Sequence, residues 1–99
     1  IPTMLVLPAE LMHAQAQTCL TLLREAARAE SGPLVWVDAA PLVRFDSSAL
    51  AVLLECRREC LLDGKQFAVR GLAPYLRELA RLYGVLGLLA EPAAAPAAA

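Results

Sequence analysis

Three short apolar segments, separated by longer stretches of helical character, limit the folds that this chain can adopt. The clearest is Leu34-Val-Trp-Val-Asp38, which is β-branched, aromatic and almost continuously apolar, as expected of a strand covered by helices. Two similar segments, at residues 3–7 and 66–69, also predict short strands. We expect Trp36, in the middle of the clearest strand, to pack in the core.

Amphipathic patterns predict helices between and after these strands. The predicted helices cover residues 11–30, 46–63 and 73–83. In the first helix, apolar residues recur at helical spacing at Ala16, Leu20, Leu23 and Ala27. Gly64 is expected to stop the second. The alternation predicts a small α/β domain, with a mixed sheet of about four strands and three helices mainly on one face.

The length and charge of the chain narrow its function. Its 99 residues are expected to form one domain over residues 1–90, followed by a flexible Ala/Pro-rich tail at 91–99. Nine basic groups against ten acidic ones, a net charge of −1, argue against generic nucleic-acid binding and against a polybasic membrane-surface module. No run of about 20 apolar residues occurs, so direct membrane insertion is not expected.

The three cysteines, Cys19, Cys56 and Cys60, are not the even, regularly spaced set of a disulfide framework. They are expected to be small buried residues in the reduced state, which fits a cytoplasmic protein. The single histidine, His13, is far in the sequence from Cys56 and Cys60, so no metal site is expected. No cofactor is expected either.

A short motif, Phe45-Asp-Ser-Ser48, marks the start of the second predicted helix. Asp46 suits the N-cap position, where its carboxylate accepts hydrogen bonds from the free N–H groups of the first turn. Ser47 and Ser48 then fall at the first two helical positions, where the helix dipole creates a mildly positive field. Taken alone, these residues are ordinary for the start of a helix.

Catalysis is not expected of this chain. Ser47 or Ser48 could supply a nucleophile, but His13 is the only conventional base, and chain order does not place it beside the serines. The sequence contains no GxSxG nucleophile elbow and no GxGxxG or GxxxxGK[ST] phosphate-binding loop. A non-enzymatic binding function is therefore favoured.

Several segments, in this order and spacing, resemble the STAS domain family, which is named for sulfate transporters and anti-sigma factor antagonists. The resemblance covers about residues 3–89 of the chain. It rests on Leu-Pro-Ala-Glu-Leu at 7–11, the strand ending at Asp38, Phe-Asp-Ser-Ser-Ala-Leu at 45–50, Gly64, the strand at 66–69 and Leu-Ala-Arg-Leu-Tyr-Gly-Val at 79–85. It implies the STAS fold and a cytoplasmic protein-interaction module rather than an enzyme.

Two bacterial branches of the family fit this length and imply different partners. In anti-sigma factor antagonists, the partner kinase phosphorylates the second serine of the motif, which corresponds to Ser48. In the STAS subunit of the Mla phospholipid-transport system, a hydroxyl residue directly after the aspartate lies at the contact with the ATPase, which corresponds to Ser47. Antagonists usually have glycine where this chain has Ala49, and the run at 79–85 is more similar to the Mla subunit. The resemblance therefore favours the Mla branch.

The favoured hypothesis is a subunit that docks on and supports the cytoplasmic ATPase of an ABC phospholipid transporter maintaining outer-membrane lipid asymmetry, at the inner face of the inner membrane. The alternative is an antagonist switched by serine phosphorylation, whose partner is an anti-sigma factor kinase. The residues expected to bind either partner are Arg44, Phe45, Asp46, Ser47, Ser48, Ala51, Val52 and Glu55. The last three are included because they are expected to lie away from the inner side of the helix. Simpler roles, in capping, core packing or an ordinary solvent-exposed surface, stay open for all of them.

Overall fold

The structure, a computed structural model, describes residues 4–89 and confirms the α/β class. In chain order, its elements are β1 (Met4–Val6), β2 (Glu10–Leu11), α1 (His13–Ala29), β3 (Leu34–Asp38), β4 (Arg44–Phe45), α2 (Ser48–Leu62), β5 (Gln66–Arg70), α3 (Pro74–Leu82) and α4 (Leu86–Leu89). The tail expected at residues 91–99 lies outside the described residues, as does Thr3 of the first predicted strand.

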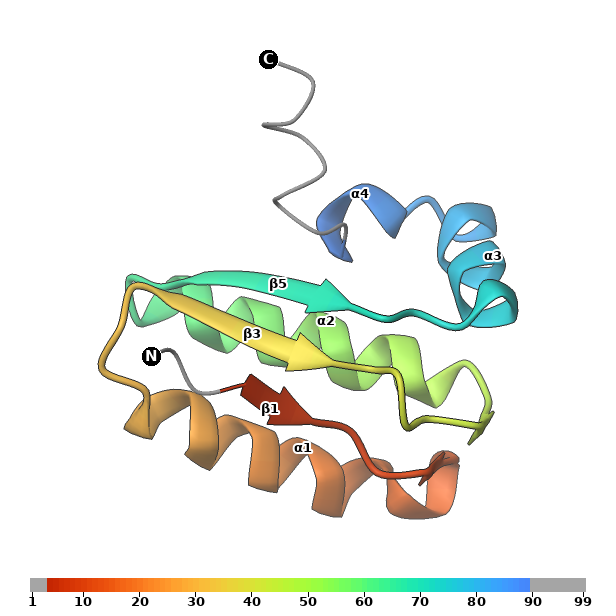
Figure 1. The fold of residues 1–99 in the computed structure, drawn as a ribbon, viewed down its shortest axis with the longest axis horizontal. Coiled ribbons are helices and arrows are strands. Elements are labelled where there is room, and N and C mark those ends of the chain that lie inside the picture. The colour runs from red at the N-terminus through yellow and green to blue at the C-terminus, as the bar shows by residue number, and fades with distance from the viewer. Residues whose placement is uncertain (1–3, 90–99) are drawn as a thin grey trace.

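The sheet differs from the prediction in the number and direction of its strands. β1, β3 and β5 form a three-stranded parallel sheet in the order β1-β3-β5, and β2 pairs separately with β4, also in parallel. The described strands therefore do not form a mixed sheet of four strands. The reason is visible in Figure 1: α1 connects β1 to β3 and α2 connects β3 to β5. A helical crossover returns the chain to the same end of the sheet, so the joined strands run in the same direction.

The two faces of this sheet differ in their cover. α1 and α2 pack against one face, while no helix of the described residues lies on the other (Figure 1). The side chains that the covered face places in the core are those of Leu5, Val35, Val37, Phe67 and Val69. Because side chains alternate along a strand, Trp36 points to the opposite face, where it is only half-buried. The expectation that Trp36 packs in the core is therefore wrong.

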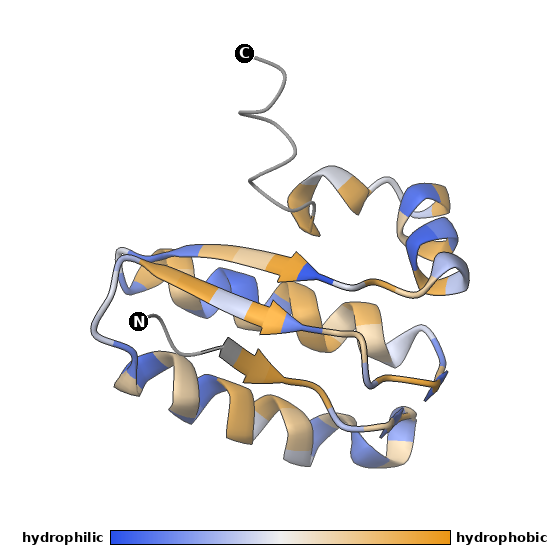
Figure 2. Ribbon diagram, viewed as in Figure 1, coloured by the Kyte–Doolittle hydropathy of each residue, from blue (hydrophilic) through white to orange (hydrophobic). Residues whose placement is uncertain are grey.

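Hydrophobic residues follow the strands along most of their length, and polar residues interrupt the surfaces of α1 and α3 (Figure 2). The helices bury the sides that face the sheet. The three cysteines lie on these buried sides, as predicted, and all are free thiols. A hydrogen bond with Cys60, together with burial, raises the pKa of the Cys56 thiol. No helix within residues 4–89 is both long and apolar enough to cross a bilayer.

A turn that follows α2 holds the C-terminal end of α2 beside the C-terminal end of α1. Gly64 adopts a φ of +76°, its N–H donates to the Leu61 carbonyl at 3.1 Å, and the Lys65 N–H donates to the Cys60 carbonyl at 2.9 Å. This pattern is a Schellman motif, which requires the left-handed conformation that glycine tolerates. The turn directs Lys65 towards α1, where its Nζ donates to the Ala27 carbonyl at 2.7 Å. Lys65 thus caps the last turn of α1 and holds it against the end of α2.

Candidate functional site

A groove of about 470 Å³ runs between the N-terminal halves of α1 and α2. Four of the predicted site residues line it from α2: Ser48, Ala51, Val52 and Glu55. The opposite wall belongs to α1 and consists of His13, Ala16, Gln17, Leu20 and Arg24. The structure therefore brings half of the predicted site residues together in this groove. It also shows that α1, which supplied none of the predicted site residues, forms the other wall.

Asp46 fixes the N-terminal end of this groove. Its Oδ1 accepts a hydrogen bond from the Ser48 backbone N–H at 2.8 Å, and its Oδ2 accepts one from the His13 backbone N–H at 3.2 Å. One carboxylate therefore serves the first N–H groups of both α1 and α2. The Ser48 backbone N–H is the main cause that holds the pKa of Asp46 below its ordinary value, and the Ser48 hydroxyl and His13 N–H add to this effect.

The two serines differ in what they present to a partner. α2 begins at Ser48, one residue later than predicted, and Ser47 occupies the N-cap position without a side-chain cap hydrogen bond. Ser47 is exposed, whereas Ser48 is half-buried and its backbone N–H donates to the carboxylate of Asp46. Ser47 is therefore the hydroxyl that is free to meet a partner at this end of α2.

The α2 residues of the groove occupy different depths. Ala51 is exposed on the rim, and half-buried Glu55 accepts a hydrogen bond from Arg58 Nη1 at 3.0 Å. Val52 is only 3% exposed and belongs to the hydrophobic core. The expectation that Val52 lies away from the inner side of α2 is therefore wrong. The reason is that α1 packs against α2 and buries a wider part of the α2 surface than the apolar stripe of α2 predicts.

Arg44 and Phe45 lie beside the groove, on β4. Arg44 is exposed, and Phe45 is half-buried with its ring stacked on that of Tyr75, at a centroid distance of 5.9 Å and an interplanar angle of 29°. Tyr75 belongs to α3, is 65% exposed, and was not a predicted site residue. No local pattern relates residues 30 positions apart, whereas the α1 wall could have been found from the predicted stripe containing Ala16 and Leu20.

His13, Asp46 and Ser48 come together here, yet they do not form a catalytic triad. Asp46 binds His13 through the backbone N–H and not through the imidazole. Ser48 bonds the Asp46 carboxylate through its backbone N–H, and no hydrogen bond among the described residues joins its hydroxyl to the His13 imidazole. Within residues 4–89, no three His, Cys, Asp or Glu side chains are grouped to hold a metal ion.

Comparisons with known proteins identify the family. The profile of the family described as "Mlab, STAS domain" matches residues 2–90 of the chain. The chain belongs to the STAS domain family. No curated protein matches the sequence significantly.

Two solved structures share the fold of this STAS domain. One is an anti-sigma-factor antagonist (STAS) domain protein from Planctomyces limnophilus, with a TM-score of 0.75 and 18% identity, over 89% of this chain and 79% of that one. The other is the anti-sigma factor antagonist SpoIIAA in its unphosphorylated form, with a TM-score of 0.70 and 17% identity, over 87% of this chain and 75% of that one. STAS domains generally mediate protein–protein interactions and are not enzymes.

The double role of Asp46 in this STAS domain predicts a loss of stability when its charge is removed. We expect Asp46→Asn to lower the melting temperature at pH 7 by about 4–8 °C, because the amide keeps one acceptor oxygen for two N–H groups and removes the negative charge at both helix N-termini. Because the pKa of Asp46 is lower in the folded state than in the unfolded state, its ionised carboxylate stabilises the fold. This contribution is complete above the ordinary pKa of 3.8 and is lost as the pH falls through the still lower pKa of the folded state. Thermal unfolding followed by circular dichroism between pH 7 and pH 2 measures the effect.

The control for this prediction is Glu25→Gln, which removes a carboxylate from an exposed position of α1. Its melting temperature should stay within about 2 °C of the wild-type value at every pH. The difference between wild type and Asp46→Asn should be constant down to about pH 4 and then shrink. A difference that stays constant to pH 2 would contradict the assigned role of the carboxylate.

Proposed function

We propose that this STAS domain docks on and supports the cytoplasmic ATPase of an ABC transporter that moves phospholipids and maintains outer-membrane lipid asymmetry. In this role it is a non-enzymatic subunit at the inner face of the inner membrane. The observation that carries the proposal is the groove between α1 and α2, which has the exposed Ser47 at one end and Ala51 on its rim. The family description, which names Mlab, supports the same branch.

The groove has features that favour a protein segment as its occupant. Ala16 and Ala51, on opposite walls, are small enough for a partner backbone to approach closely. Half-buried Leu20 offers apolar surface between them, and His13, Gln17 and Glu55 add polar groups. An apolar strip with polar groups around it is typical of a binding interface. The stacked pair of Phe45 and Tyr75 adds exposed aromatic area near the start of α2, and aromatic residues are common at interface hot spots.

The alternative is an anti-sigma factor antagonist switched by phosphorylation of Ser48. Both solved structures named above are anti-sigma factor antagonist structures, which favours this alternative at the level of the fold. The methyl group of Ala49 is fully buried, so it does not hinder a kinase at the surface. The exposure of Ser47 favours the Mla branch, whereas Ser48 is half-buried and less accessible to a kinase.

The test is direct binding to purified partners from the same organism. The chain is mixed with the ATPase subunit of its phospholipid transporter, and separately with an ATP-binding anti-sigma factor kinase, and each mixture is analysed by size-exclusion chromatography and isothermal titration calorimetry. We expect a stable complex with the ATPase and a change in its rate of ATP hydrolysis. Binding to the kinase alone, with phosphate found on Ser48 by mass spectrometry, would overturn the proposal.

Ser47→Asp tests the position of the docking surface. We expect this variant to bind the ATPase at least about tenfold more weakly, because a buried unpaired carboxylate at an interface costs more than 1.4 kcal/mol. Its melting temperature should be unchanged or slightly raised, because an acidic N-cap residue favours the helix N-terminus. Ser47→Ala is the matched control for loss of the hydroxyl alone. Full affinity in Ser47→Asp would place the docking surface elsewhere.

A further inference from the structure

We propose that the docked segment of the ATPase supplies an acidic side chain that binds Arg24 and Arg28 on α1. This inference rests on the proposed function and deepens it, because it names the chemistry of the partner. It extends the docking surface from the start of α2 to the C-terminal halves of both helices.

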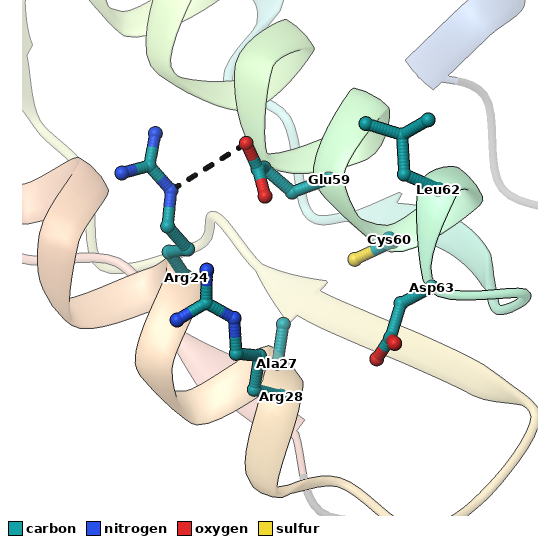
Figure 3. Close-up of a pocket in the computed structure, with 7 residues that line it drawn as sticks. All are labelled: Arg24, Ala27, Arg28, Glu59, Cys60, Leu62 and Asp63. Carbon is teal, nitrogen blue, oxygen red and sulfur yellow. Dashed lines mark ion pairs between the residues drawn. The ribbon is translucent and has the colours of Figure 1, made fainter.

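Arg24 belongs to two neighbouring hollows between α1 and α2. It lines the groove described above, and it also lines a second cleft of about 140 Å³. Figure 3 shows this cleft, with Arg24 and Arg28 on the α1 side and Glu59, Cys60 and Asp63 on the α2 side. Arg24 therefore lies between the two hollows, and a segment that fills the first lies next to the second.

The guanidinium groups in this cleft lack adequate partners. Arg24 Nε is buried and donates no hydrogen bond, and its one ion pair, with Glu59 Oε2, is long at 3.8 Å. Arg28, one helical turn further along α1, forms no ion pair with any described residue. The other carboxylate of the cleft, that of Asp63, is paired with Lys65 Nζ at 3.3 Å. Of the two guanidinium groups, only that of Arg24 has a carboxylate partner among the described residues, and that partner is distant.

A carboxylate from a partner would correct this imbalance. The Arg24 side chain is 30% exposed, and a planar guanidinium can bind a carboxylate with two parallel hydrogen bonds. Docking would withdraw this ion pair from solvent, so its gain is larger than that of an exposed ion pair. A protein side chain is the source favoured by position, because Arg24 also lines the groove in which the partner segment lies.

The geometry also sets where the acidic residue lies in the partner. Glu59 follows Ala51 by eight positions, or about 12 Å along the axis of α2. If the partner segment is a helix lying along the seam, its acidic residue is therefore about eight positions from the small residue that meets Ala51. This spacing can be read from the sequence of the ATPase.

The experiment compares two substitutions that break the same ion pair from opposite sides. Binding of the purified ATPase subunit to the full chain is measured by isothermal titration calorimetry at low and high salt. We expect Arg24→Gln to weaken binding about tenfold at low salt, and less at high salt. We expect Glu59→Gln to leave binding unchanged or tighten it up to about fivefold, because Glu59 competes with the partner for Arg24. Arg70→Gln, an exposed charge removed from the opposite face of the sheet, should have no effect.

The signs of the two effects decide the outcome. If both substitutions weaken binding, Arg24 and Glu59 act by holding α1 against α2, and the inference is wrong. It is also wrong if Arg24→Gln binds as tightly as the wild-type chain. In either case the proposed function stands provided that the wild-type chain binds the ATPase and Ala51→Arg does not. Melting temperatures of all variants show whether a weakened complex reflects a destabilised domain.

Discussion

The variant Ala51→Arg is expected to lose measurable binding to the transporter ATPase, with a dissociation constant raised more than about 100-fold. Ala51 is exposed on the rim of the α1–α2 groove, opposite Ala16. An arginine there fills the space that a partner segment would occupy and adds a charge that docking would bury. Both effects act on the complex alone, because the side chain is free to extend into solvent in the unbound domain.

The fold should tolerate this substitution. Alanine and arginine are both strong helix formers, and their intrinsic propensities differ by only a few tenths of a kcal/mol. We therefore expect the melting temperature of Ala51→Arg to stay within about 2 °C of the wild-type value. Ala26→Arg is the matched control, since Ala26 is exposed on α1 and lines neither hollow of the α1–α2 surface.

The comparison of the two arginine variants is decisive for the docking surface. Calorimetric titration with the ATPase should separate them by two orders of magnitude, with Ala26→Arg close to wild type. Equal affinities for both variants would remove the groove from the interface, whatever the partner. Equal losses in both would indicate that added positive charge weakens the complex in general, and would leave the groove without support.

The second large effect concerns stability. Leu53 is fully buried in α2, at the contact with the core, so we expect Leu53→Ala to destabilise the domain by about 3 kcal/mol. For a domain of this size, the loss corresponds to a fall in melting temperature of roughly 12–24 °C. Urea unfolding followed by circular dichroism measures the free energy of unfolding directly.

The same substitution at Leu62 is the control. Leu62 lies on the same helix but is 72% exposed, so Leu62→Ala should change the free energy of unfolding by no more than about 0.5 kcal/mol. The pair reports which side of α2 faces the core, and therefore which side is left to form the groove. Similar costs at both positions would mean that α2 is rotated, and the residues assigned to the groove would have to be reassigned.

Much of the fold could be predicted from local patterns. The strand Leu34–Asp38 has the predicted limits, and Gly64 ends α2 as expected. The two-residue strands β2 and β4 were missed, because a strand this short has no periodicity of its own. Its existence depends on the pairing of Glu10 with Arg44 and of Leu11 with Phe45, more than 30 residues away.

The candidate site shows the same difference between features set by neighbouring residues and features set by distant ones. The motif at residues 45–48 indicated where α2 begins, because the cap of a helix depends on residues next to each other in the chain. The burial of Val52 and the exposure of Trp36 went against expectation. Each depends on which side of a helix or strand is covered by another element, and a single segment does not carry that information.

The sequence by itself determined the order of β1, β3, β5 and the three longer helices, the limits of α2 to within one residue, and the burial of the cysteines. These features follow from hydrophobic periodicity and from hydrogen bonds between near neighbours in the chain. The tertiary structure alone decided that Asp46 would cap α1 as well as α2, that Tyr75 would stack on Phe45, and that Arg24 would face Glu59. Each of these contacts joins residues about 30 or more positions apart, so it exists only once the helices have packed on the sheet and set which of their sides meet.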